Sequence, residues 1–157
     1  MHTDINDNRF QVVTPIGRVD LVLTDASGNV KDARKRHNMV VTSGLQFLAA
    51  RLLSAAAPLS HIAVGTGTSP AAAGQTALAT ELGRTAVGAS SLVTTAVTND
   101  SVMYTATFGP GTATGPITET GMLDAATDGT LFSRTVFDVI NKGSADTLTI
   151  TWVVQFS

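Results

Sequence analysis

Histidines are the residues of this sequence best suited to bind a metal, and the chain has three of them, His2, His37 and His61. A zinc-type site needs three or four donor side chains that converge on one point. None of the three histidines has a second histidine or a carboxylate at ligand spacing on one helix face. The chain has no cysteine, which excludes disulfides, thiolate metal sites and cysteine nucleophiles. We therefore expect neither a metal ion nor another cofactor.

A glycine-rich segment, Gly65-Thr66-Gly67-Thr68-Ser69-Pro70, has some of the composition of a phosphate-binding loop. The third glycine of a dinucleotide fingerprint would fall at Pro70, and no Gly-Lys-Thr follows, so a turn that ends a strand is the better interpretation. The Gly-x-Ser-x-Gly elbow of serine hydrolases is missing. Carboxylates such as Glu81 and Glu119 are few and scattered; two of them can meet in space as glycosidase acids do, but the sequence singles none out. These patterns predict a protein that is not an enzyme.

The most pronounced charge run is Lys31-Asp32-Ala33-Arg34-Lys35-Arg36-His37. Its simplest interpretation is a solvated strand or loop. The functional interpretation is an electrostatic contact with an acidic protein surface, for which Arg34, Lys35 and Arg36 are the candidate residues. Nucleic acid is not an expected partner, because no aromatic platform accompanies the basic residues and the net charge is −2.

Length and composition indicate a single domain. A chain of 157 residues is long enough to bury roughly two-thirds of its unfolded surface. Residues 1–9 hold few apolar side chains and are expected to form an N-terminal arm, and residues 10–157 one β-rich domain. The start of the chain lacks the features of a signal peptide, and no apolar run reaches the ~20 residues that cross a bilayer, so we expect synthesis in the cytoplasm and no membrane partner.

Charged residues make up only 14% of the chain, against the roughly 25% usual for soluble domains. A monomer with so few charges is poorly protected against association. We therefore expect partners to cover part of the surface.

Strict alternation of apolar and polar residues predicts a strand at the end of the sequence. Leu148, Ile150, Trp152, Val154 and Phe156 take every second position, with threonines among the residues between them. Such a strand places an apolar face on a core and a threonine-rich face outward. For its aromatic residues, and for the other aromatics in alternating strands, core packing is a better explanation than a sugar-binding platform; these are Trp152, Phe156, Phe108, Tyr104 and Phe137.

Shorter strands separated by turns are expected along most of the chain. A hairpin with its turn at 25–29 opens the domain, and further strands are expected at 61–68, 85–97, 102–108, 117–123 and 131–140. Several short strands with regular turns predict an antiparallel β-sandwich, of which a jelly-roll-like arrangement is one form.

Two helices are expected beside the strands. Thr42-Ser43 resembles an N-cap for a main helix over 44–57, which Pro58 stops. Its apolar stripe would consist of Leu45, Leu48, Ala49, Leu52 and Ala56. A short second helix is expected over 76–82, with Gly83 as its C-terminal cap.

Five segments occur in an order that resembles tailed-bacteriophage virion proteins. They are Val40–Ala49, Ile62-Ala63-Val64-Gly65-Thr66-Gly67-Thr68, Thr76–Arg84, Ile117-Thr118-Glu119-Thr120-Gly121 and Leu131-Phe132-Ser133-Arg134, followed by the terminal strand. The resemblance covers roughly positions 38–156, and the shared pattern carries no catalytic residues.

The resemblance implies a structural protein of a virion. The first expectation is a capsid decoration or cement protein on the capsid surface, which binds the major capsid protein and itself. A homotrimer is expected because icosahedral shells have local three-fold points. The alternative is a tail-fibre or tail-adaptor component, although the chain stops soon after its last predicted core strand, which favours the capsid protein. An alternative of another class is a hydrolase or carbohydrate-binding module whose site the sequence does not show.

Overall fold

The computed structural model describes residues 14–156, so the arm predicted at residues 1–9 lies outside the described residues. This part of the chain forms nine strands and one helix. In order they are β1 (Pro15–Thr24), β2 (Val30–Val40), α1 (Thr42–Leu52), β3 (His61–Gly65), β4 (Glu81–Ala86), β5 (Ala89–Val93), β6 (Ser101–Phe108), β7 (Gly115–Leu123), β8 (Leu131–Lys142) and β9 (Thr147–Phe156). The prediction of a mainly β, antiparallel fold is confirmed.

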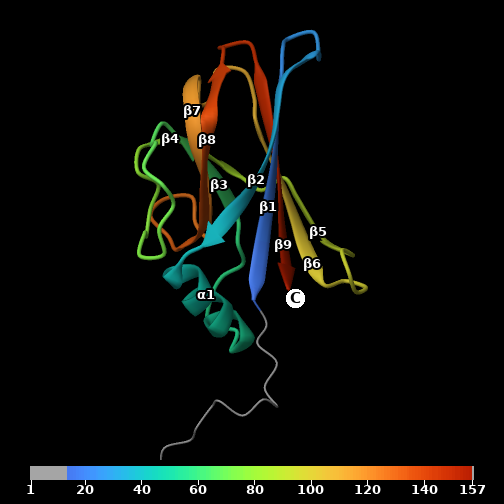
Figure 1. The fold of residues 1–157 in the computed structure, drawn as a ribbon, viewed down its shortest axis with the longest axis vertical. Coiled ribbons are helices and arrows are strands. Elements are labelled where there is room, and N and C mark those ends of the chain that lie inside the picture. Colours follow the sequence, from blue (N-terminus) through green and yellow to red (C-terminus); the bar gives the residue numbers. More distant parts are fainter. Residues whose placement is uncertain (1–13, 157) are drawn as a thin grey trace, which may run out of the picture.

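The strands form one antiparallel sheet that curls until its two halves face each other (Figure 1). The strand order is β4-β3-β7-β8-β2-β1-β9-β6-β5. β2 pairs along most of its length with β1, but it pairs with β8 only at Met39↔Arg134 and Val40↔Ser133. The fold is therefore a pair of facing half-sheets joined through the end of one strand, which gives the shape of an open half-barrel.

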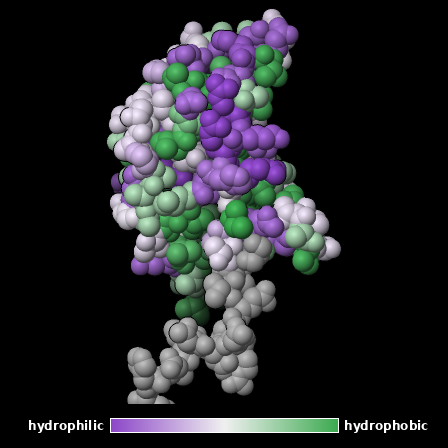
Figure 2. Space-filling view, in the orientation of Figure 1, coloured by the Kyte–Doolittle hydropathy of each residue, from purple (hydrophilic) through white to green (hydrophobic). Residues whose placement is uncertain are grey.

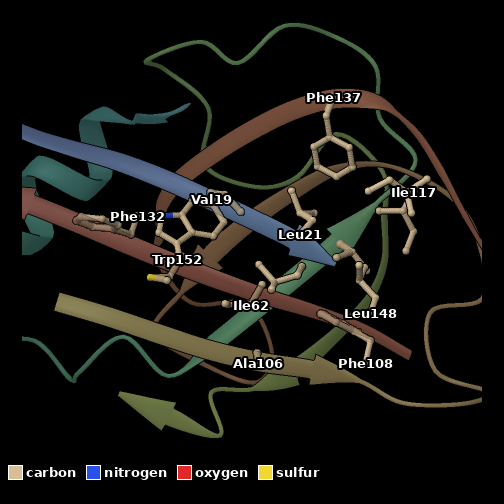
Figure 3. Packing of buried hydrophobic residues seen from close by; sticks show 14 of the residues in the cluster. Val19, Leu21, Ile62, Ala106, Phe108, Ile117, Phe132, Phe137, Leu148 and Trp152 are labelled. Carbon is tan, nitrogen blue, oxygen red and sulfur yellow. The ribbon is translucent and has the colours of Figure 1, made fainter. Parts of the chain in front are cut away.

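The hydrophobic core fills the space between the two half-sheets (Figure 3). Val19 and Leu21 of β1 and Trp152 of β9 point into it from one side, and Ile62 of β3 from the other; all four are fully buried. Burial of each such side chain stabilises the fold by roughly 1.5–3 kcal/mol. This shared interior holds the two half-sheets together.

The alternation predicted for the last strand is confirmed in β9. Leu148, Ile150, Trp152 and Val154 are all buried, whereas Thr147, Thr149 and Thr151 are half-buried on the other face. The strand lies between β1 and β6 in the sheet. Its apolar face therefore packs at the centre of the core, as the sequence predicts.

The predicted turn of the first hairpin is also confirmed. The Asp25 carboxylate accepts hydrogen bonds from the backbone amides of Ser27 and Asn29, at 2.8 and 2.9 Å. Gly28 has a φ of +85°, in the left-handed region that glycine adopts without strain.

The main helix differs from the prediction at both ends. α1 covers Thr42–Leu52 rather than 44–57, and its N-cap is Val41, without a side-chain cap. The predicted cap at Thr42-Ser43 is wrong because the Ser43 hydroxyl donates to the carbonyl of Leu131 at 2.7 Å instead. The hydroxyl group that would cap the helix is therefore engaged in a hydrogen bond with β8.

The predicted apolar stripe is only in part the buried face of α1, since Leu48 packs against the core whereas Leu45 and Leu52 do not. The buried residues are Gly44 and Phe47, while Leu45 is 51% and Leu52 90% exposed. A Cβ at Gly44 would lie 2.1 Å from the carbonyl oxygen of Phe132, so only glycine permits this approach. The ring of Phe47 meets that of Phe132 edge-on, with centroids 6.0 Å apart. This contact leaves Leu45 and Leu52 facing outward.

The short helix predicted over 76–82 is wrong. Residues 76–80 form bends and irregular backbone, and Glu81 begins β4, which pairs with β3. The backbone amides of Ala79 and Thr80 donate to the carboxylate of Glu119, at 3.0 and 2.8 Å. A long-range carboxylate therefore occupies amides that a helix would have used.

Candidate functional site

The three candidate contact residues of β2 do not share one face of the sheet. Arg34 and Arg36 lie opposite Leu21 and Val19, whose side chains enter the core, and directly opposed residues point to the same side. Lys35 lies opposite Asp20 and points to the outer side. The basic run is therefore divided between the two sides of its strand, as alternation in any strand requires.

Carboxylates neutralise much of this run. Arg34 Nη1 lies 2.6 Å from an oxygen of Asp32, and Arg36 Nη2 lies 3.7 Å from one of Asp138. Lys35 is the one member of the candidate trio for which residues 14–156 provide no ion pair. The positive charge available to a partner is thus concentrated at Lys35, on the outer face.

A second charged cluster, which sequence reasoning missed, is fully buried. Glu119 of β7 and Arg134 of β8 are both 0% exposed, and Arg134 Nε donates to Glu119 Oε2 at 2.7 Å. Arg134 Nη2 lies 2.7 Å from the same oxygen. We call these two residues the Glu119–Arg134 pair.

The Glu119–Arg134 pair fastens the loop 66–80, which connects β3 to β4, against the outer face of β7 and β8. The Glu119 carboxylate accepts from the amides of Gly67, Ala79 and Thr80, at 2.8 to 3.0 Å. Arg134 Nη1 donates to the carbonyl of Ser69 and to the side-chain oxygen of Gln75, both at 3.0 Å. Both ends of the loop are therefore tied to one ion pair.

Apolar packing under the loop reinforces this attachment. Leu78 of the loop packs in a small cluster with Ala63, Leu123, Leu131 and Val41, on the side of the sheet away from the main core. A Cβ at Gly121 would lie 2.6 Å from the Leu78 side chain, so glycine lets the loop approach closely. The loop thus covers part of the outer face of this half-sheet.

Two glycines leave room for the Glu119 carboxylate. A Cβ at Gly65 or at Gly67 would lie 2.5 Å from Glu119 Oε1, closer than such contacts allow. The glycine-rich segment that resembled a phosphate loop is therefore filled by a carboxylate of the same chain. The segment does bind an anionic group, as its composition suggests, but that group is the carboxylate of Glu119.

Burial and hydrogen bonding act in opposite directions on Glu119. Burial raises the pKa of its carboxyl group, but the amides of Thr80, Ala79 and Gly67 and the Arg134 guanidinium lower it, so that the pKa lies below its ordinary value of 4.5. A carboxyl group with a lowered pKa stabilises the fold fully above its unfolded pKa, and this stability disappears as the pH falls through the folded value.

We therefore expect acid to weaken the protein through Glu119. The free energy of unfolding, measured with urea, should fall steeply below about pH 4.5. Glu119→Gln has no titrating group at this position, so its free energy of unfolding should fall less steeply over the same pH range. An identical pH dependence in both proteins would remove Glu119 as the cause.

A further set of charged residues, Lys31, Lys142 and Asp146, lies near the start of β2 and holds the turn between β8 and β9. Lys142 is 2% exposed and donates to the carbonyl of Gly109 at 2.8 Å, and burial lowers its pKa. Asp146 accepts from Lys31 Nζ at 2.6 Å and from the amide of Gly143 at 2.7 Å; these bonds lower the pKa of Asp146. All of these contacts are within the fold and position the turn.

An apolar surface lies at the α1 end of the molecule, where Figure 2 shows hydrophobic residues gathered below the hydrophilic stripe. Leu45, Leu52 and Leu53 are 51%, 90% and 82% exposed. We call these three residues the α1 surface. A single exposed leucine is common on protein surfaces. A group of exposed leucines is typical of a surface that binds another protein.

The other residues considered for chemistry lie apart. His61 Nδ1 is 2.8 Å from the Ser60 hydroxyl, His37 is exposed on β2, and His2 lies outside the described residues. Among residues 14–156, no group of three or more histidine, cysteine, aspartate or glutamate side chains is placed to hold a metal ion. No helix in that range is long and apolar enough to span a bilayer.

The aromatic side chains belong mainly to the core, as predicted. Trp152 and Phe108 are 0% exposed and Phe137 is 8% exposed, while Tyr104 and Phe156 are partly buried against the core. The described surface therefore offers no cluster of exposed aromatics for a sugar.

Comparisons of the chain with protein-family models, with curated proteins and with solved structures gave no match.

Proposed function

We propose that this protein is a structural component of a tailed-phage virion that decorates the capsid and binds neighbouring proteins through the α1 surface. The proposal starts from the resemblance of its ordered segments to such proteins. The α1 surface is the observation that carries it, because Leu52 and Leu53 leave large apolar side chains in water at one end of the molecule. The partners would be the major capsid protein and further copies of this chain, for which we propose a homotrimer.

The segments that carry the resemblance also have a common physical role. Gly67, Thr80, Glu119 and Arg134 come from four different segments and meet at the Glu119–Arg134 pair. Such a buried network holds the loop 66–80 in one position. A rigid body of this kind suits a protein that must fit a repeating lattice.

Decoration would stabilise a shell by mass action. A protein that binds only the assembled lattice adds its binding free energy to that lattice. When each oligomer bridges several shell subunits, weak contacts add up through multivalency. A small apolar surface on each copy is therefore sufficient for retention.

The proposal is tested by adding the purified protein to capsids that lack it. Wild-type protein should co-sediment with the shells in many copies spread over the surface, whereas Leu53→Asp should bind at least tenfold more weakly. Leu92→Asp, at a leucine of β5 that is 62% exposed, is the matched control and should bind normally. Equal retention of Leu53→Asp and wild type would contradict the proposal. Binding of the protein to the tails of whole virions, but not to their capsids, would favour a tail-fibre or tail-adaptor component.

If an acidic capsid surface also contributes, Lys35 should carry the electrostatic part. Lys35→Gln should weaken binding at low salt more than Arg34→Gln or Arg36→Gln, because carboxylates of the chain already neutralise both arginines. The difference should disappear at high salt. Binding that does not depend on salt in any of the three variants would exclude this contact.

A further inference from the structure

An apolar groove runs between α1 and the ends of β1 and β9, beside the α1 surface. Its outer part is lined by Pro15, Leu48, Arg51, Leu52 and Phe156. Its inner part has a volume of about 180 Å³ and shares Leu48, Arg51 and Phe156 with the outer part. The inner part reaches the rings of Phe47, Tyr104 and Phe132.

We propose that this groove is the binding site of the chain's own segment Phe10-Gln11-Val12-Val13. The inference concerns the isolated protein. Leu52 belongs both to the groove and to the α1 surface, so a bound segment would leave Leu45 and Leu53 as the exposed part of that surface. It would extend the folded domain to residue 10.

Connectivity is the first argument for this occupant. The described part of the chain begins at Thr14, and the next residue, Pro15, is itself one wall of the groove. An extended chain advances about 3.3–3.6 Å per residue, so Phe10 can lie up to roughly 17 Å from Pro15. The segment therefore begins directly beside its proposed site, because Pro15 lines the outer part of the groove.

Composition is the second argument. Phe10, Val12 and Val13 are apolar, whereas residues 1–9 are mostly polar or charged. The inner part of the groove is lined by aromatic rings, which suits the ring of Phe10. The segment nearest the groove thus carries side chains of the kind that the groove can bury.

The tether is the third argument. A segment held a few residues from its site has an effective concentration of about the millimolar range, so weak contacts are sufficient for occupancy. A second copy of the chain would have to reach comparable concentrations to compete. The chain's own segment is therefore favoured over a neighbour.

Cysteine cross-linking tests the proposal directly, because the chain has no cysteine of its own. Val12→Cys combined with Leu52→Cys should form an intramolecular disulfide under mild oxidation, seen as a monomer with faster migration in non-reducing gels. Leu52 is 90% exposed, so its replacement should not disturb folding. Val12→Cys with Ala33→Cys, whose second site lies opposite Val22 towards the far end of β1, is the control and should not cross-link.

Hydrogen exchange gives a second readout. Phe10→Ala should speed exchange of the α1 amides by about tenfold or more, whereas Gln11→Ala should leave it unchanged. Absence of both the cross-link and the exchange effect would overturn the proposal. A cross-link that joins two chains would also overturn it, because the occupant would then be a second copy.

Discussion

Glu119→Ala is expected to lower the free energy of unfolding by about 3–5 kcal/mol, the range for removing one partner of a buried ion pair. The substitution leaves the Arg134 guanidinium buried without its carboxylate. It also leaves the amides of Gly67, Ala79 and Thr80 without their acceptor. Urea unfolding followed by circular dichroism would measure the loss.

Two variants make this prediction specific. Arg134→Met should cost less than Glu119→Ala, because Glu119 would retain its three backbone donors. Asp138→Asn, which breaks the exposed pair with Arg36, should change stability by about 1 kcal/mol or less. If Glu119→Ala and Asp138→Asn were equally mild, the buried pair would not hold the loop 66–80 as described.

Trp152→Ala is expected to have an effect of similar size, about 3–5 kcal/mol, because it leaves a large cavity between the half-sheets. Trp152 is fully buried at the centre of the core and pairs with Val19 on one side and Tyr104 on the other. The midpoint temperature of thermal unfolding should fall by about 2–4 °C for each kcal/mol of stability lost.

Trp152→Phe should be much milder than Trp152→Ala. The indole Nε1 of Trp152 is buried without a hydrogen-bond partner among the described residues, so phenylalanine removes an unsatisfied donor together with some packing. Thr151→Ala, on the outer face of the same strand, is the control and should stay within about 0.5 kcal/mol of wild type. A loss from Trp152→Phe as large as that from Trp152→Ala would contradict this account of the core.

The strands could be predicted because their signal is local. In β9 every second residue is apolar, and that pattern alone determines which face enters the core. The turn at Asp25 likewise depends on side chains within a few residues of each other. Both features were predicted correctly from neighbouring residues.

The helices were predicted less well because contacts distant in sequence decide them. The stripe that includes Leu45 and Leu52 is a sound helical pattern, but the close approach of Gly44 to Phe132 sets which face is buried. In the segment 76–82, hydrogen bonds from the Ala79 and Thr80 amides to the Glu119 carboxylate override a helical composition. Neither contact leaves a periodic signal in the sequence.

The buried cluster was missed for the same reason. Glu119 and Arg134 are 15 positions apart, and no spacing rule joins them. A signal did exist, since each lies in a segment of the resemblance and Gly65 and Gly67 lie in another. A closely spaced pair of glycines, together with one charged residue in each of two other segments, points to a close internal contact as readily as to a ligand.

The place of β9 in the sheet has a consequence for how fast the protein can fold. β9 lies between β1 and β6, and its pairing with β1 joins positions such as Thr24 and Thr147, which are 123 residues apart. Loops of that length must close before the pairing gives any stability, and proteins dominated by such contacts fold in about milliseconds to seconds. Until β9 is inserted, β1 and β6 have no strand between them, so their unpaired edges and apolar sides stay exposed to association with other chains during that interval.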